Sequence, residues 1–192
     1  MYKQTILHKL QLSVLPELND GRRQLMQGQT LKASAVLVPI FSFNDQLCIV
    51  LTQRQGFLRH HANQISFPGG KKDPTDKTLA DTALRETFEE IGVDINAVSI
   101  INKLSEIQTP SGFSITPYTG FIAEHAQFKL NYQEVRHLVY LPLEVLLQQT
   151  DWACYSVKIK NRYHQVYAFQ YNEHFIWGAT AAILKQLSMI LK

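Results

Sequence analysis

Three glutamates crowd the end of one predicted helix, and this pattern constrains the fold more than any other feature of the 192-residue chain. Residues 78–91 carry helical periodicity, and Gly92 follows where a C-terminal cap glycine is expected. Glu86, Glu89 and Glu90 share one band of this helix, because positions three and four apart are neighbours. The stripe predicted to pack inward lies roughly opposite and consists of Ala80, Ala83, Leu84, Phe88 and Ile91.

The glutamate band is unfavourable for a helix that only needs to be stable. Each exposed pair of like charges costs about 0.2–0.5 kcal/mol, and the helix dipole disfavours negative charge in the last turns. Divalent cations reverse both effects, and Mg²⁺ prefers hard carboxylate oxygens. The alternative interpretation is a solvated acidic face.

Two neighbouring features favour the metal interpretation. Arg85 stands beside the glutamates and can bond Glu89 one turn further on. Before the helix, Gly69 and Gly70 are followed by Lys71 and Lys72. Glycines allow a phosphate to approach the backbone closely, and lysines supply positive charge. The region therefore indicates a metal-dependent site for a diphosphate.

The remaining pattern predicts the α/β class, with a mixed β-sheet sandwiched between helices. Residues 1–30 are expected to form a helical or irregular lead-in segment, and residues 31–192 one domain. Besides the helix at 78–91, the expected elements are strands at 33–43 and 46–53 joined as a hairpin, a polar loop at 54–66, strands at about 97–107 and 113–123, a short strand and helix within 139–149, strands near 153–159 and 163–170, and a terminal helix at about 176–191.

Composition excludes several classes of protein. Hydrophobic residues make up 45% and charged residues 18%, which is ordinary for a globular protein. The net charge of +3 lacks the clustering expected of a nucleic-acid-binding surface. No apolar run approaches the roughly 20 residues needed to span a bilayer. We expect Cys48 and Cys154 to be buried thiols, no secretory signal, and a cytoplasmic protein.

Other chemistries find less support. The seven histidines show no ligand spacing typical of zinc sites, and no G-x-S-x-G motif indicates a serine nucleophile. Trp177 is expected to lie in the core rather than to stack on an adenine.

The helix and its preceding loop resemble a known motif. The pattern Gly70-x5-Asp76-x8-Arg85-Glu86-x2-Glu89-Glu90-x-Gly92 is similar to the Nudix box, G-x5-E-x7-R-E-U-x-E-E-x-G-U. Asp76 replaces a glutamate, one residue is added before Arg85, and Thr87 stands where an aliphatic or small residue is usual. The resemblance implies a Nudix fold, Glu86, Glu89 and Glu90 as ligands of Mg²⁺ or Mn²⁺, and catalytic roles for Arg85 and Glu89.

The upstream segment resembles the signature of the coenzyme A diphosphatase branch of this family. It reads Leu51-Thr52-Gln53-Arg54-x4-Arg59-x-His61-x2-Gln64-x2-Phe67-Pro68-Gly69-Gly70. Gln55 replaces a small residue, and Asn63 replaces a glycine. Because asparagine tolerates positive φ, the backbone at Asn63 is expected to be unchanged. Together with the matches at 109–112, 116–117 and 175–181, the resemblance covers about residues 33–190.

This resemblance implies hydrolysis of coenzyme A or its derivatives to adenosine 3′,5′-bisphosphate and 4′-phosphopantetheine. Another nucleoside-diphosphate conjugate, such as ADP-ribose or a dinucleotide, is the enzymatic alternative, and a non-catalytic ligand sensor is the rival class. The partner is a nucleotide-like small molecule, with a homodimer left open. The residues expected to bind the substrate are Arg54, Arg59, His61, Gly69, Gly70 and Lys71.

Several of these roles have a plainer alternative. Arg54 and Arg59 could be surface charges, and His61 could serve only to stabilise its loop. Glu134 lies outside the box, in the polar loop 131–134, and glutamates on such loops can act as the general base or a further ligand in this family. For Glu134, a solvated loop acid is the competing interpretation.

Overall fold

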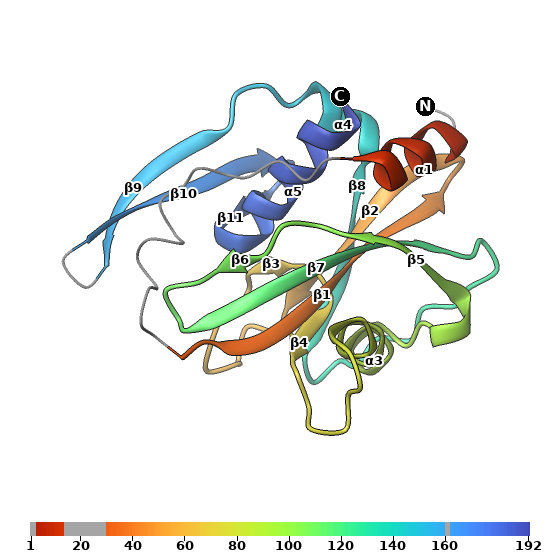
Figure 1. The fold of residues 1–192 in the computed structure, drawn as a ribbon, viewed down its shortest axis with the longest axis horizontal. Coiled ribbons are helices and arrows are strands. Elements are labelled where there is room, and N and C mark those ends of the chain that lie inside the picture. The colour runs from red at the N-terminus through yellow and green to blue at the C-terminus, as the bar shows by residue number, and fades with distance from the viewer. Residues whose placement is uncertain (1–2, 14–29, 160–161) are drawn as a thin grey trace.

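The computed structural model describes residues 3–13, 30–159 and 162–192. Its main sheet, which Figure 1 shows across the centre of the molecule, has eight strands. These are β1 (Lys32–Phe43), β2 (Gln46–Arg54), β3 (Ile65–Ser66), β4 (Gly69–Lys71), β5 (Val98–Lys103), β6 (Ile107–Gln108), β7 (Phe113–Ile122) and β8 (Val135–Pro142).

The main sheet is mixed, as the sequence predicted. Its order is β3-β2-β1-β7-β5, while β4 pairs with β1, β6 with β7, and β8 with β2. β1 and β7 run parallel, and the other pairings in this sheet are antiparallel. The predicted hairpin is confirmed: β1 and β2 join through Asn44 and Asp45, both at positive φ.

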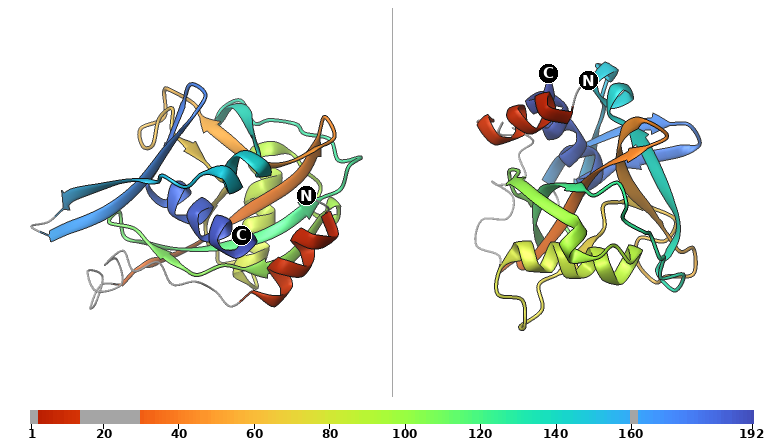
Figure 2. Two further views of the ribbon diagram at one scale, coloured as in Figure 1. Left: turned by 90° about the horizontal axis from the view of Figure 1, so that it is seen from above. Right: turned by 90° about the vertical axis from the view of Figure 1, so that its right-hand side faces the viewer.

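A second sheet and, among the described residues, five helical segments complete the fold. The second sheet contains β9 (Ala153–Ile159), β10 (Arg162–Tyr171) and β11 (His174–Trp177). The helical segments are α1 (Lys3–Leu12), α3 (Leu79–Ile91), the 3₁₀ helix η1 (Ile95–Ala97), α4 (Leu143–Gln148) and α5 (Gly178–Leu191). In Figures 1 and 2, α3 covers one side of the main sheet, and α5 lies on the other side beside the second sheet.

Strand alternation explains these layers. In β2, Ile49 and Leu51 join the large core that contains α5, whereas Val50 between them packs in the cluster that contains Ile91 of α3. Successive side chains of a strand point to opposite faces, so a continuous apolar run predicts a strand covered on both faces. Ile6 and Leu10 of α1 also join the large core, although they belong to the predicted lead-in; residues 14–29 of that segment lie outside the described residues.

Four predicted features differ in the structure. The terminal helix begins at Gly178, because residues 174–177 pair with β10 as strand β11. Strand β8 begins at Val135 rather than near 139, and the strand predicted at 97–107 is split between β5 and β6. Cys48 is buried as expected, but the expectation for Cys154 was wrong: it is exposed on β9. No helix in the described ranges is both long and apolar enough to cross a membrane.

Helix α3 presents a different face from the one predicted. Thr78 and Asp81 form a capping box at its start, and Gly92 caps its end at φ 69°. The buried positions are Thr82, Ala83, Thr87, Glu90 and Ile91. Phe88 is 53% exposed, so its assignment to the inward stripe was wrong. The inward face is centred on small residues, which let α3 lie close to β1 and β4, rather than on the largest apolar side chain.

Candidate active site

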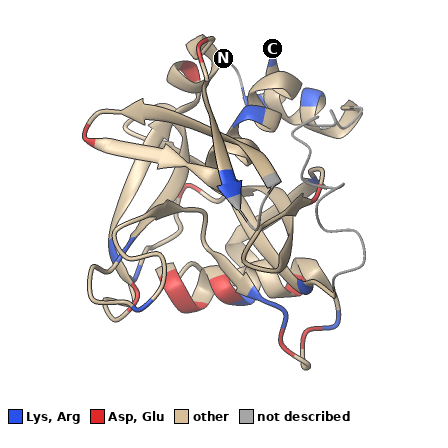
Figure 3. Cartoon of the chain, turned by 90° about the vertical axis from the view of Figure 1, so that its left-hand side faces the viewer, with Lys and Arg blue, Asp and Glu red and all other residues tan. Residues whose placement is uncertain are grey.

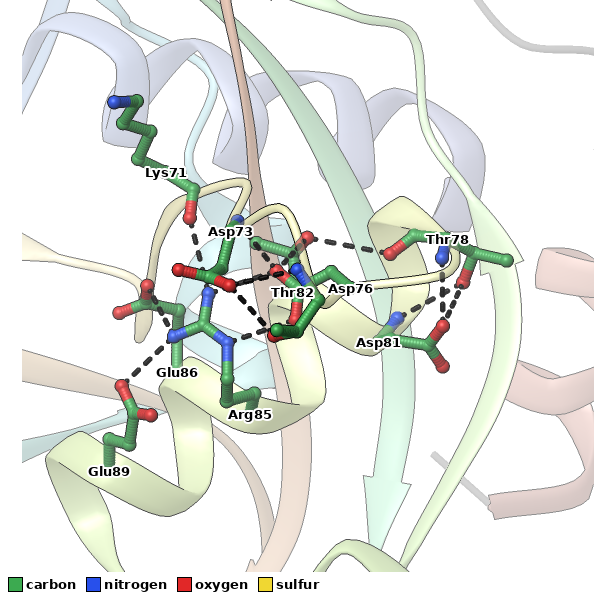
Figure 4. A network of polar contacts seen from close by, with 10 residues as sticks. Lys71, Asp73, Asp76, Thr78, Asp81, Thr82, Arg85, Glu86 and Glu89 are labelled. Carbon is green, nitrogen blue, oxygen red and sulfur yellow. Dashed lines mark hydrogen bonds and ion pairs between the residues drawn. The ribbon is translucent and has the colours of Figure 1, made fainter.

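The candidate active site contains a polar network centred on the guanidinium of Arg85 (Figure 4). Its Nε and Nη2 donate to the two carboxylate oxygens of Asp76, each at 3.0 Å. Its Nη1 donates to Glu86 and to Glu89, both at 2.9 Å, and its Nη2 also donates to the carbonyl of Lys71. The predicted contact with Glu89 is therefore confirmed, and one cation orients three acids.

Asp76 anchors Arg85 to the rest of the domain. Its buried carboxylate also accepts from the backbone N–H of Asp73 and from the Thr82 hydroxyl. The Arg85 guanidinium holds the pKa of Asp76 well below its usual range. The sequence comparison had marked Asp76 only as a departure from the usual motif. In the structure Asp76 anchors Arg85, because the two parallel hydrogen bonds between them fix the plane of the guanidinium.

Glu90 is a carboxylate with almost no contact with solvent. Its residue is 3% exposed, and burial raises the pKa of Glu90 to about 8, although nearby Arg54 partly opposes this. Arg54 Nη1 lies 3.5 Å from the carboxylate, and the backbone N–H of Gly69 donates to it at 3.4 Å. Glu90 thus lies between the end of β2 and the start of β4.

Two more acids lie near Glu90. Glu86 is partly buried, which raises its pKa despite the bond from Arg85, and Glu134 raises the pKa of both Glu86 and Glu90 by charge repulsion. The carbonyl of Glu134 accepts from Gln55, which ties its loop to the end of β2. A Cβ on Gly70 would overlap the Glu86 carboxylate, so a side chain at position 70 would displace this acid from its present place.

The site suits an oxygen-preferring cation by its chemistry. Glu86, Glu90 and Glu134 concentrate negative charge in a partly desolvated place, where bound cations relieve repulsion. Figure 3 shows the acids of α3 with basic segments in the loops on either side. As the side chains lie, no three His, Cys, Asp or Glu residues in the described part of the chain gather closely enough to hold a metal. Arg85 instead draws Glu86 and Glu89 toward itself.

The other predicted residues lie at the end of β2, in the loop that follows it, and in β4. Arg59, His61 and Lys71 are exposed, while Arg54 reaches Glu90. His61 Nδ1 lies 2.8 Å from Gln64 Oε1, and the Arg54 N–H donates to the Gln64 carbonyl. Asn63 has φ 60°, which confirms the expectation for this replacement of glycine.

A cavity of about 460 Å³ adjoins the acidic site. Arg54 and Gly69, the two partners of Glu90, also line this cavity. Trp177 lines it too and is 44% exposed, so the prediction that Trp177 lies in the core was wrong. Because residue 177 belongs to a strand, its side chain alternates with that of buried Ile176. No local sequence pattern indicates this cavity, because its walls come from segments far apart in the chain.

Comparison with known proteins identifies the family. Residues 31–156 match the model of the NUDIX domain. The chain is 36% identical over 181 residues to an uncharacterized Nudix hydrolase, NudL, of Pectobacterium atrosepticum, covering 94% of this chain and 90% of that one. A protein of the same name from Yersinia enterocolitica is 38% identical over 81% of this chain and 79% of its own.

A solved structure agrees with the fold. The Nudix hydrolase RenU of M. smegmatis gives a TM-score of 0.50 at 18% identity, over 59% of this chain and 71% of that one. The matches to the family model and to the curated relatives show that the chain belongs to the Nudix hydrolases.

The Asp76–Arg85 pair should stabilise the fold measurably. Replacing Asp76 by Asn leaves a partly buried guanidinium with one partner fewer. We expect a loss of about 2–3 kcal/mol in the free energy of unfolding at pH 7, less than the roughly 3–5 kcal/mol of a fully broken buried pair because Arg85 keeps two acids. Urea unfolding of the variant and of an Asp151→Asn control, an exposed acid before β9, measures this.

The same pair predicts a dependence on pH. The folded state lowers the pKa of Asp76, so its stabilisation is present above the unfolded pKa of about 3.9 and is lost as pH falls toward the folded value. The difference between wild type and Asp76→Asn should be constant from pH 5 to 7 and shrink below about pH 4. A variant as stable as the control at pH 7 would contradict the anchoring role.

Proposed function

We propose that this Nudix hydrolase cleaves the diphosphate bond of coenzyme A or its derivatives, giving adenosine 3′,5′-bisphosphate and 4′-phosphopantetheine. The supporting observation is the position of Glu90. It belongs to the Nudix box, and it contacts Arg54 and Gly69, both in the segment that resembles the signature of the coenzyme A branch. One buried acid therefore joins both motifs in a single site.

Each residue has a distinct proposed role. Glu86 and Glu90 would hold Mg²⁺ or Mn²⁺, with Glu89 as a further ligand or base in the same place. The metal supplies charge neutralisation for the diphosphate and activation of water. Arg85 keeps the carboxylates in position, which makes it a positioning residue.

Glu134 and the glycines complete the arrangement. Glu134 lies close enough to Glu86 and Glu90 to affect the pKa of both, as a general base must be near the reacting water. It would accept the proton of the attacking water. Gly69 and Gly70 would let a phosphate approach the backbone of β4 closely. Arg54 would contact the diphosphate, while Arg59, Lys71 and His61, which are exposed, would bind more distant parts of the substrate.

Substitution of the acids tests these roles. Glu86→Gln and Glu90→Gln should each lower kcat by about 100-fold or more while the fold is retained, because each removes a ligand charge. Glu134→Gln should lower kcat by a similar factor with little change in KM. Steady-state kinetics with Mg²⁺, alongside circular dichroism, measures both effects.

An exposed acid provides the control for these variants. Glu124→Gln changes a glutamate in the link between β7 and β8 and should match the wild type. If Glu86→Gln or Glu90→Gln retained most of the magnesium-dependent activity, the assignment of ligands would be wrong. If Glu134→Gln showed the same kinetics as the wild type across pH 6–9, Glu134 could not be the general base.

The choice of substrate is tested with a panel of diphosphates. Coenzyme A carries a 3′-phosphate, which exposed cations such as Arg59 and Lys71 can bind. A charge-assisted hydrogen bond contributes about 1.5–3 kcal/mol, which corresponds to roughly 10- to 150-fold. With Mg²⁺ or Mn²⁺, we expect kcat/KM for coenzyme A at least tenfold above that for dephospho-coenzyme A, ADP-ribose and a dinucleotide.

Exposed basic residues should account for the preference for coenzyme A over dephospho-coenzyme A. Arg59→Ala should narrow the gap between coenzyme A and dephospho-coenzyme A, whereas Lys103→Ala, which removes an exposed charge on β5, should not. Products separated by chromatography identify the bond that is cleaved. Faster turnover of ADP-ribose or the dinucleotide would favour the alternative substrate class. If no diphosphate were hydrolysed, the proposed diphosphatase activity would be wrong.

A further inference from the structure

Two exposed aromatic side chains near the acidic site have no role in the chemistry described so far. Phe57 is 72% exposed and Tyr132 is 68% exposed, and neither lines the cavity. Single exposed apolar side chains are ordinary on a protein surface. These two, however, lie close in sequence to residues of the proposed site. Phe57 follows Arg54 by three positions, and Tyr132 precedes Glu134 by two.

The turn that carries Tyr132 is fixed against the acidic site. At its start, the backbone N–H of Asn131 donates to the carbonyl of Glu90 at 2.9 Å. The turn then closes on the carbonyl of Asn131, which accepts from the backbone N–H groups of Glu134 and Val135 at 2.9 and 2.8 Å. A tyrosine held on such a turn loses little conformational freedom when it binds a ligand.

A second turn, next to the first, carries Phe57. The carbonyl of Tyr132 accepts from the side chain of Gln55 at 2.8 Å, and Phe57 lies two residues beyond Gln55. Between them, Gly56 lies against the side chain of Asn63, where a Cβ would come within 2.9 Å of the amide oxygen. Both aromatic residues are therefore attached to fixed backbone at the edge of the same site.

The loop around Phe57 also suits an anionic ligand. Residues 54–64 contain two arginines, Arg54 and Arg59, and neither aspartate nor glutamate. Arg59 is exposed and lies two positions after Phe57. An aromatic ring attracts the flat face of a nucleobase, and a guanidinium attracts phosphate. The loop thus offers contacts for two parts of a nucleotide.

A nucleobase fits the two aromatic side chains better than the other parts of the proposed substrate do. Ribose, phosphate and the pantetheine arm have no aromatic face. A base can stack on an exposed ring and keep the polar groups of its edge in water. We propose that Phe57 and Tyr132 bind the adenine of the substrate by stacking, which places the nucleotide half of the diphosphate over residues 54–64. This rests on the proposed function.

Two ligands that differ in the base test the stacking without any hydrolysis. Adenosine 5′-monophosphate and ribose 5-phosphate share the sugar and the phosphate, so the ratio of their Kd values measures the contribution of the base. Without metal, we expect the adenosine ligand to bind the wild type about 5- to 150-fold more tightly, which corresponds to about 1–3 kcal/mol for one stacked base. Calorimetry with both ligands measures this ratio.

Substitution of either aromatic residue should lower that ratio. Phe57→Ala and Tyr132→Ala should each weaken binding of adenosine monophosphate by about fivefold or more and leave binding of ribose 5-phosphate unchanged. Phe57→Tyr and Tyr132→Phe keep a ring and should bind as the wild type does. Phe57→Leu keeps apolar bulk without a ring and should behave like Phe57→Ala. The matched control is Tyr163→Ala, which removes a ring of equal exposure on β10 and should keep the wild-type ratio.

Kinetics separates this proposal from the proposed function. With Mg²⁺, Phe57→Ala and Tyr132→Ala should raise KM for coenzyme A by about fivefold or more with kcat near the wild-type value, because the base contributes equally in ground and transition states. Binding that depends on the base, in a protein that hydrolyses no diphosphate, would uphold the stacking site and refute the diphosphatase. Equal binding of the two ligands by the wild type, or unchanged Kd and KM in both folded alanine variants, would overturn the stacking site and leave the diphosphatase intact.

Discussion

The burial of the Glu90 carboxylate is the constraint on which the site depends. A charge removed from water must be paired or neutralised. The available partners are a guanidinium at 3.5 Å and one long backbone hydrogen bond, and the pKa rises to about 8. With Glu86 and Glu134 nearby, the local charge is unbalanced. In the proposed function, a divalent cation and an anionic substrate would restore the balance when they bind.

Two structural features hold Glu86 and the neighbouring acids close together. Asp76 holds Arg85 through a paired contact, and Arg85 in turn orients Glu86 and Glu89. Glycine at position 70 lets β4 lie against the Glu86 carboxylate, a place that any side chain would fill. Stability of the domain and geometry of the site thus depend on the same contacts. Functional sites commonly retain such locally unfavourable charge in return for chemistry.

Much of this arrangement was predictable from the sequence, and the exceptions have physical causes. Periodicity, the cap at Gly92 and the spacing of the glutamates identified α3, because these are local signals. Phe88 was wrongly assigned to the inward face of α3. Apolar character alone does not show which side of a helix packs against a sheet, and in α3 the buried side carries small residues. Trp177 was misplaced because residues 174–177 are a strand only through pairing with β10. The cavity beside the acidic site is a tertiary feature, formed by segments far apart in the chain.

Cation binding at Glu90 is the central claim, and thermal unfolding tests it without reference to catalysis. A ligand that binds only the folded state raises the free energy of unfolding by RT ln(1 + [L]/Kd), so stability increases with the logarithm of the ligand concentration above Kd. Titration with Mg²⁺ or Mn²⁺ should raise the Tm of the wild type. It should leave the Tm of Glu90→Gln nearly unchanged, while the Tm of that variant without metal equals or exceeds that of the wild type. An equal rise in both proteins, or none in either, would contradict a cation site built on Glu90.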